Sequence, residues 1–271
     1  MRRGGPKKTS GTIAPASTGR PTFARADHRP YHRGTMGSLL RVVLEVVRTR
    51  AFAVAVDWPG LTRGGRDEDA ALDALVRAGP RYAAALAVTG VPFQPPGDRG
   101  GLAVVDRLAG TAGTEFGAPS VHLPGDDEPL AAEELERHAA ILRAGWAAFE
   151  AVAALYAGDE LRKGPRGGGR DLPKIAEHVR GADQAYLVKL GSRPPKDPAG
   201  PAPLEELHAA ALAALQARAL GLPVPNASRA VSLWTPRWYV RYATWHWLDH
   251  AWEIEDRALP PGAPPGAPPG T

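Results

Sequence analysis

Three connectors rich in proline and glycine divide the second half of the chain into four segments, each long enough for a helix. The connectors read GPRGGGR, GSRPPKDPAGPAP and GLPVPNASRAVSLWT. Proline lacks the amide hydrogen that a helix interior needs and glycine costs backbone entropy, so both interrupt helices. The predicted helices cover residues 130–157, 171–190, 203–220 and 236–257. Four amphipathic helices of similar length favour an antiparallel four-helix bundle.

The residues before these helices predict a small α+β unit. Valine-rich stretches at 38–50 and 51–57 predict strands, and PGLTRGG predicts a turn after them. DEDAALDALVRAGPRYAAALA predicts a helix with Asp67 as its N-cap, and LAVVDRL at 102–108 predicts another strand. Asp171 and Thr235 are the predicted N-caps of two later helices, because a proline follows each within two residues.

The predicted fold is therefore a small α+β N-terminal domain followed by an all-α antiparallel four-helix bundle. Both ends of the chain lack hydrophobic periodicity, and the last residues repeat PPGA, so both are predicted to be disordered. Four regions are expected: a disordered basic tail at 1–36, the α+β domain at 37–122, the bundle at 129–258, and a disordered Pro/Gly tail at 259–271.

The basic character of the chain comes from its first residues. Residues 1–35 contain eight Lys or Arg and one acid, which gives +7, whereas the whole chain carries +4. Residues 36–271 therefore sum to −3, and nucleic acid is not an expected partner of the folded part.

Cysteine and membrane chemistry are excluded by composition. The chain has no cysteine, which excludes disulfides, thiolate metal sites and a cysteine nucleophile. No apolar run approaches the roughly 18 residues of a membrane span, and the N-terminus lacks the apolar core of a signal peptide. We expect a soluble cytoplasmic protein.

The stretch TWHWLDHAWEIEDR at 244–257 carries the densest unusual chemistry. On a helical wheel, His246, His250 and Glu253 fall within about 60° of one another, in the middle of a broad apolar arc. Buried imidazoles and a carboxylate need partners, because an unpaired buried polar group costs on the order of 1–3 kcal/mol. Either a divalent metal or a hydrogen-bonded network of His, Glu and Tyr would supply them. The side of the helix opposite to this arc carries Arg241, Thr244 and Glu255.

A third metal ligand should come from another helix. His178 is the best candidate, because it lies at the edge of the apolar face of its helix, where that helix would line a groove between its neighbours. His138 lies in the charged stretch EELERHAA, and His208 follows LEEL, which indicates a solvated or boundary position. We therefore expect these two histidines to lie outside the site.

The region from about 130 to 257 resembles the DinB-like superfamily of metalloenzymes. The resemblance rests on four helical segments, a histidine in the middle of the second, and WHWLDHAWEIEDR near the end of the fourth. It implies a divalent metal held by one histidine from the second helix and an H-x-x-x-H pair from the last. At the matching positions these are His178, His246 and His250.

Three neutral nitrogens with open coordination positions favour Zn, Ni or ferrous Fe. Glu253, one turn beyond His250, is the expected catalytic proton acceptor or partner of a metal ligand. The resemblance also implies transfer or isomerisation reactions that depend on a low-molecular-weight thiol. The Ala-, Arg-, Gly- and Pro-rich composition is typical of a high-GC bacterium, which makes mycothiol the first expectation among such thiols.

The connector RKGPRGGGRD at 162–171 precedes the second of the four helices. Its cations, glycines and helix N-terminus predict an anion site, with Arg166 and Arg170 as the contacts to a carboxylate or phosphate of the substrate. The alternative is a flexible, solvated connector.

Residues 39–88 resemble a HicB-like antitoxin domain, through the strand AFAVAVDWPG, the turn LTRGG and the helix that begins RDEDAAL. The resemblance implies a partner protein, as in toxin–antitoxin pairs, although the DNA-binding module of that family has no counterpart here. The domain could otherwise bind a ligand, mediate a homodimer or cover the bundle.

Two functions are therefore expected as alternatives. The first is a metal-dependent, thiol-dependent transferase or isomerase acting on a small-molecule substrate. The second is a non-enzymatic binding or regulatory protein related to HicB-type antitoxins.

Overall fold

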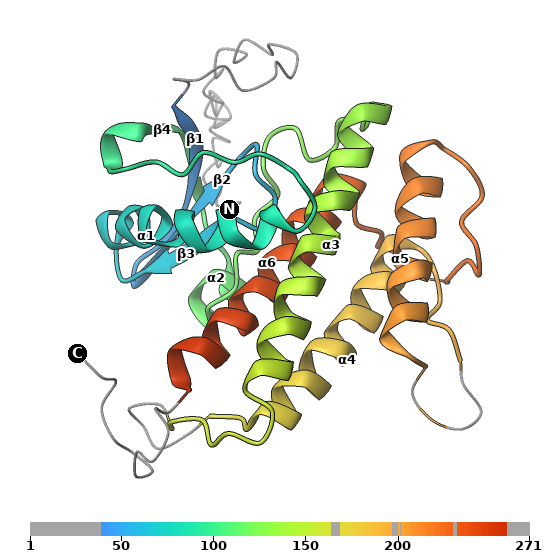
Figure 1. The fold of residues 1–271 in the computed structure, drawn as a ribbon. Coiled ribbons are helices and arrows are strands. Elements are labelled where there is room, and N and C mark those ends of the chain that lie inside the picture. Colours follow the sequence, from blue (N-terminus) through green and yellow to red (C-terminus); the bar gives the residue numbers. More distant parts are fainter. Residues whose placement is uncertain (1–38, 164–168, 197–199, 201, 230–231, 259–271) are drawn as a thin grey trace, which may run out of the picture. The chain divides into compact units, whose positions relative to one another are not determined.

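A computed structural model describes residues 39–163, 169–196, 200, 202–229 and 232–258. The predicted disordered tails at 1–36 and 259–271 lie outside the described residues, and so does Arg166. The architecture is mixed α/β, with a four-stranded sheet followed by helices (Figure 1).

The sheet has the strand order β3-β2-β1-β4. The strand β1 pairs antiparallel with β2 and parallel with β4, and β2 pairs antiparallel with β3. The parallel pair needs a crossover, and the helix α1, capped by Asp67 as predicted, lies between β3 and β4 in the chain. The bounds are β1 Leu40–Val47, β2 Arg50–Ala55, β3 Thr62–Gly65, α1 Glu68–Ala87 and β4 Leu102–Ala109.

The predicted turn PGLTRGG is wrong in its second half, because Thr62–Gly65 forms the strand β3. The glycines there do not mark a turn. A Cβ on Gly65 would lie 2.3 Å from the backbone nitrogen of Ala71, so this glycine allows β3 to approach the first turn of α1.

The four predicted long helices are present, with ends that differ from the predicted bounds by at most two residues. Asp171 and Thr235 cap two of them through their side chains, as expected. A short helix, α2, follows β4 and was not predicted. The bounds are α2 Ala112–Phe116, α3 Ala132–Leu155, α4 Leu172–Leu190, α5 Leu204–Ala219 and α6 Pro236–Arg257.

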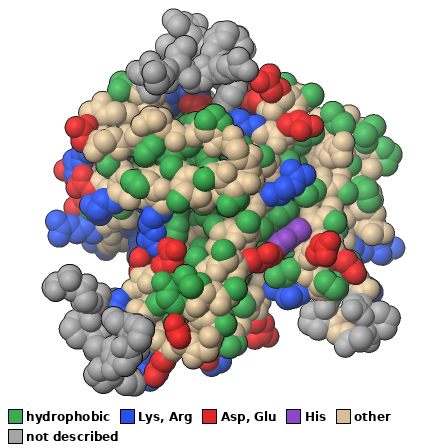
Figure 2. All heavy atoms as spheres, viewed as in Figure 1, with side chains coloured by type: hydrophobic (Ala, Val, Ile, Leu, Met, Phe, Trp, Pro, Cys, Tyr) green, Lys and Arg blue, Asp and Glu red, His purple; other side chains and the backbone are tan. Residues whose placement is uncertain are grey.

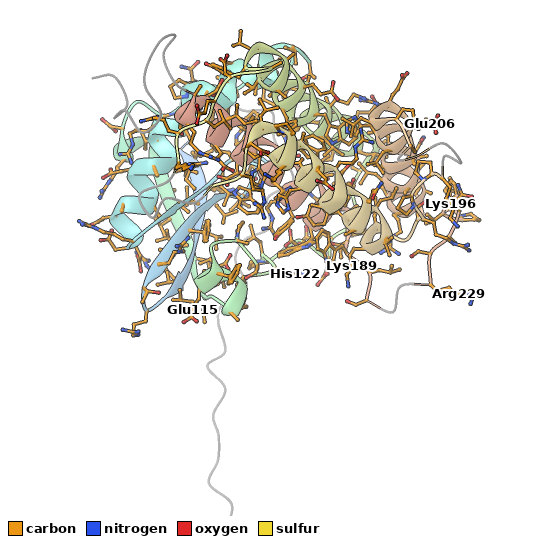
Figure 3. All side chains as sticks on the ribbon, turned by 90° about the horizontal axis from the view of Figure 1, so that it is seen from below. Glu115, His122, Lys189, Lys196, Glu206 and Arg229 are labelled. Atoms are coloured by element: carbon orange, nitrogen blue, oxygen red, sulfur yellow. The ribbon has the colours of Figure 1, made fainter. Side chains whose placement is uncertain are left out.

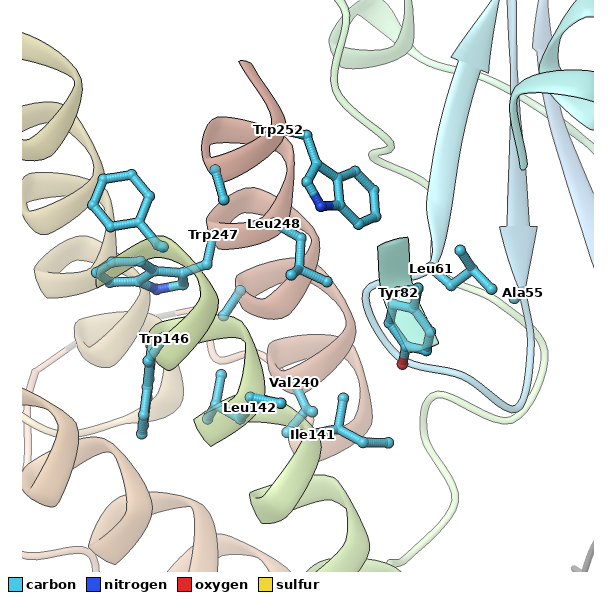
Figure 4. Packing of buried hydrophobic residues seen from close by; sticks show 14 of the residues in the cluster. Ala55, Leu61, Tyr82, Ile141, Leu142, Trp146, Val240, Trp247, Leu248 and Trp252 are labelled. Carbon is cyan, nitrogen blue, oxygen red and sulfur yellow. The ribbon is translucent and has the colours of Figure 1, made fainter. Parts of the chain in front are cut away.

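The helix α6 lies at the centre of the helical part. It contacts α3, α4 and α5, and one cluster of buried residues joins it to α1 and the sheet. In Figure 4, Trp252 lies on the side of α6 toward Tyr82 and the sheet, whereas Trp247 lies on the other side. Residues before and after the expected domain boundary at 122–129 share this core. That boundary therefore stays a prediction.

The side of α6 opposite to the histidines is buried too, which the helical wheel did not indicate. Thr244 is fully buried and Arg241 is 5% exposed. Two glycines make room for Thr244: a Cβ on Gly60 would lie 2.5 Å from its Cγ2, and one on Gly145 would lie 3.1 Å from the same atom. The wheel separates apolar from polar positions on one helix, but it does not show which other elements cover each side.

Charged side chains of both signs cover the surface. Figure 2 shows acidic and basic side chains interspersed with apolar ones on the face toward the viewer. Figure 3 shows Lys196, Glu206 and Arg229 at the end of the molecule that includes α5, and all three are exposed. None of the described helices is long and apolar enough to cross a membrane.

Candidate metal centre

Three histidines converge between α4 and α6. His178 comes from the middle of α4, while His246 and His250 lie one turn apart on α6. Each offers a ring nitrogen, and the three nitrogens lie within 4.8 Å of one another. The Nε2 atoms of His178 and His246 are 3.2 Å apart. The structure therefore brings together the three histidines predicted to be metal ligands, and these residues could hold a metal ion.

The spacing of the nitrogens suits a single ion. Zinc–nitrogen bonds of about 2.1 Å at tetrahedral angles separate two ligand atoms by about 3.4 Å. The three rings meet edge to face, with centroids 5.1 Å (His178–His246), 5.0 Å (His178–His250) and 4.7 Å (His246–His250) apart. The rings thus surround a common point, and small side-chain movements would bring all three nitrogens to bonding distance.

Two of the histidines are held in the neutral form that binds metals. Burial is the main cause of the lowered pKa of both His178 and His246, and the positive charge of Arg170 lowers the pKa of both further. A neutral imidazole has a free lone pair on one nitrogen, which a protonated one lacks. The site is therefore ready to accept a cation at neutral pH without first releasing protons from these two residues.

Glu253 orients His250. One of its carboxylate oxygens lies 2.7 Å from Nδ1 of His250, and the other accepts a hydrogen bond from Nη1 of Arg257 at 2.5 Å. A carboxylate on Nδ1 favours the tautomer in which Nε2 carries the lone pair. The hydrogen bond from His250 is the main cause of the lowered pKa of Glu253. A carboxylate with a lowered pKa is a weaker general base. The contact with Nδ1 and this lowered pKa both favour the role of a residue that orients the metal ligand His250. The expected role of Glu253 as catalytic proton acceptor stays a prediction.

Arg257 connects the end of α6 to the predicted anion-binding connector. Its guanidinium donates to the backbone oxygens of Arg162 and Arg170, both at 2.8 Å. Arg170 is exposed, and its charge acts on His178 and His246. Of the two arginines predicted to bind an anion, Arg170 is therefore close enough to lower the pKa of two of the histidines, whereas Arg166 lies outside the described residues.

Aromatic rings border the histidine group. Tyr186 lies 5.5 Å from His246 between ring centroids and 5.3 Å from Tyr242, and Trp245 lies 6.0 Å from His246. His178 is only partly buried, which leaves an approach from that side. The group thus has an apolar interior wall and one side accessible to solvent.

The other histidines expected to lie outside the site do not join this group. His138 is buried, with Nδ1 2.7 Å from the backbone oxygen of Glu134, and burial lowers its pKa to about 4. His208 stacks on Trp146 with ring centroids 3.9 Å apart. Both are packing residues in this structure.

Three residues near the site were not singled out from the sequence. Arg257 could have been found, because it lies four residues after Glu253 on one helix, where opposite charges meet. Tyr186 and Asp183 gave no such signal, because their partners lie on a helix more than 50 residues away in the chain. Their role depends on how α4 and α6 pack.

Asp183 is a buried carboxyl group between α4 and α6. It accepts a hydrogen bond from Nε1 of Trp247 at 3.3 Å, and burial raises its pKa to about 7. Because the folded-state pKa lies above the unfolded value, the protonated form stabilises the fold, and this stability is lost as pH rises from about 4 through about 7. We expect Asp183→Asn to gain stability relative to the wild type over this range, by on the order of 4 kcal/mol at pH 8.

Urea unfolding at pH 5 and pH 8 measures this difference. The histidines are the same in both proteins, so their contribution cancels in the comparison. The exposed Asp159 serves as the matched control, and the stability difference between Asp159→Asn and the wild type should be the same at the two pH values. A stability difference for Asp183→Asn that does not change with pH would show that this carboxyl group does not titrate in the range.

Comparison with protein-family models, with curated proteins and with solved structures gives no match to this chain. The resemblances to DinB-like and HicB-like proteins therefore stay predictions, and we infer a function from the geometry of the site.

Proposed function

We propose that the chain is a metal-dependent enzyme that acts on a small molecule, with one divalent ion held by His178, His246 and His250. The observation that carries the proposal is that three imidazole nitrogens from two helices lie within 4.8 Å of one another. The alternative account is a structural network in which Nε2 of His178 and Nε2 of His246 share a hydrogen bond, with Nδ1 of His246 buried and without a hydrogen-bond partner among the described residues.

The proposal includes the DinB-like assignment and an antiparallel four-helix bundle built from α3, α4, α5 and α6. Contacts of α6 with α3 and α4, and of α5 with α4, support this arrangement. The ligands come from the second and the last of these helices, as the resemblance implies.

Three neutral nitrogens favour Zn, Ni or ferrous Fe and leave coordination positions for water or substrate. A bound ion of this kind supplies Lewis acidity and lowers the pKa of a coordinated water or thiol. Glu253 and Arg257 fix the orientation of His250. Tyr186 and Trp245 border the histidines on the buried side and would keep water away from the ion there.

Arg170 is the proposed contact for an anionic group of the substrate. It is exposed, lies just before α4, and acts electrostatically on two of the three histidines. The ligand that we expect first at this position is a low-molecular-weight thiol such as mycothiol. It would be the co-substrate of a transferase or isomerase.

Calorimetric titration of the metal-loaded protein with mycothiol tests this function. We expect binding that requires the metal and that weakens in Arg170→Gln, while Arg143→Gln, an exposed arginine on α3, leaves it unchanged. Equal binding to the loaded protein and to a His246→Gln variant without metal would refute a metal-dependent thiol site. Absence of thiol binding would exclude the thiol and leave the metal site to be tested separately.

Glu253→Gln is expected to weaken metal binding by about 10–100-fold, because the carboxylate that orients His250 becomes a neutral amide. Competition with a chromophoric chelator measures the affinity. The exposed Glu160 is the matched control, and Glu160→Gln should retain the wild-type affinity. An unchanged affinity in Glu253→Gln would show that the contact between Glu253 and His250 does not support the site.

A further inference from the structure

We propose that a second pocket, on another side of α6, binds a small organic oxyanion, which is a carboxylate or phosphate joined to a flat apolar group. The pocket has a volume of about 430 Å³, a size typical of small-molecule sites. It brings together the start of β2, the strand β3, the end of α2 and the middle of α6. Its walls include Arg50, Phe52, Arg63, Gly64, Gly117 and Trp245.

Positive charge dominates the pocket. Arg50, Arg63 and Arg66 line it together with one acid, Asp249. Asp249 accepts a hydrogen bond from Nη1 of Arg63 at 2.8 Å, which positions that guanidinium. Arg66 pairs with Asp67 at 3.2 Å, but its side chain is 88% exposed, and such surface pairs exchange readily for a better anion.

Among the arginines of this pocket, Arg50 is the one without an acidic partner among the described residues. It is exposed and forms no ion pair with any of the described residues. A guanidinium presents parallel N–H groups that match the two oxygens of a carboxylate or phosphate. Arg50 and Arg63 thus offer two such donors on the same concave surface.

The floor of the pocket suits an apolar group. Phe52 and Trp245 are both buried and meet edge to face with ring centroids 6.4 Å apart. Gly64 has no side chain, so a ligand can approach the backbone of β3 closely there. A ligand that joins an oxyanion to an aromatic ring would use both the arginines and this floor.

Another pocket, of about 540 Å³, does not have this character. It is lined in part by Arg99, whose guanidinium is already held by Asp69 at 2.7 Å and by Asp73 at 2.5 and 2.6 Å. Arg77 also lines this pocket, together with Asp73 and Asp98, so its two arginines and two aspartates balance in charge. The contrast favours the pocket at Arg50 as the site for an external anion.

Titration calorimetry with phenyl phosphate tests the proposal. We expect binding to the wild type, and a dissociation constant at least about tenfold higher in Arg50→Gln, because a charge-assisted bidentate contact is lost. Arg48→Gln removes the same charge two residues away, outside the pocket, and should change the constant less than about twofold. Inorganic phosphate should bind more weakly than phenyl phosphate, because it has no ring to contact Phe52 and Trp245. Titration with benzoate shows whether a carboxylate can replace the phosphate.

Metal content is measured in each variant, so that this site is distinguished from the histidine group. Arg50→Gln should lose phenyl phosphate and keep its metal. Equal losses in Arg48→Gln and Arg50→Gln would reveal general charge attraction and overturn the proposal, as would absence of binding to the wild type at about 10 mM phenyl phosphate. Because Arg50 and Arg66 are both exposed, Arg66→Gln provides a second variant that should fold and should also weaken binding.

Discussion

Replacement of His246 by alanine is expected to weaken the binding of a divalent metal at least about 100-fold, because removing a ligand costs at least as much as removing a residue that orients one. Nε2 of His246 lies 3.2 Å from Nε2 of His178, and the ring lies 4.7 Å from that of His250 between centroids. Without it, two ligands from different helices remain. Competition with a chromophoric chelator at neutral pH measures the change.

His246 is 7% exposed, so its truncation also leaves a cavity. His246→Gln keeps more of the volume and should lose the metal while retaining the fold, as checked by circular dichroism. His122 is the matched control, because its side chain is 50% exposed and it lies outside the histidine group. If His246→Ala and His122→Ala bind metal equally well, the three-histidine site does not exist.

The largest expected loss of stability follows from Arg241→Ala, at about 3–5 kcal/mol. Arg241 forms an ion pair with Asp126, and the two side chains are 5% and 6% exposed. Its guanidinium also lies over the ring of Trp238, 4.6 Å from the centroid. Removing the arginine leaves the Asp126 carboxylate buried, with the backbone amide of Leu123 as a hydrogen-bond partner at 2.7 Å and Nδ1 of His122 4.0 Å away. Urea unfolding at neutral pH gives the free energy difference.

The exposed Arg66 provides the control for this change, and Arg66→Ala should leave the free energy of unfolding nearly unaltered. Replacing both Arg241 and Asp126 by apolar residues should restore part of the loss, because no unpaired charge then remains buried. A loss below about 1 kcal/mol in Arg241→Ala would mean that water or another group compensates the Asp126 carboxylate.

The parts of the fold that could be predicted are those set by nearby residues. The long helices follow from Pro- and Gly-rich connectors and from caps such as Asp171 and Thr235, which act within one turn. The strand β3 was missed because Gly64 and Gly65 indicate a turn, whereas in the fold Gly65 allows α1 to approach and Gly64 lies against the ring of Phe52. Likewise the ion pair between Asp126 and Arg241 joins residues 115 positions apart.

The candidate site shows the same division. The spacing of His246 and His250 and the position of His178 on its helix were sufficient to predict the group that the structure brings together. The contact of Glu253 with His250 could be anticipated as one of two roles, because both residues lie on one helix. The approach of Tyr186 to His246 could not, because it depends on how α4 packs against α6.

The most direct test of the central claim is the metal content of the purified protein, measured together with the X-ray absorption spectrum of the bound metal. We predict about one equivalent of Zn, Ni or Fe per chain, with three imidazole nitrogens at about 2.1 Å for zinc, and loss of this signal in His246→Gln. A wild-type protein that binds no divalent metal when supplied with Zn, Ni and Fe, or a spectrum without imidazole scattering, would contradict the account.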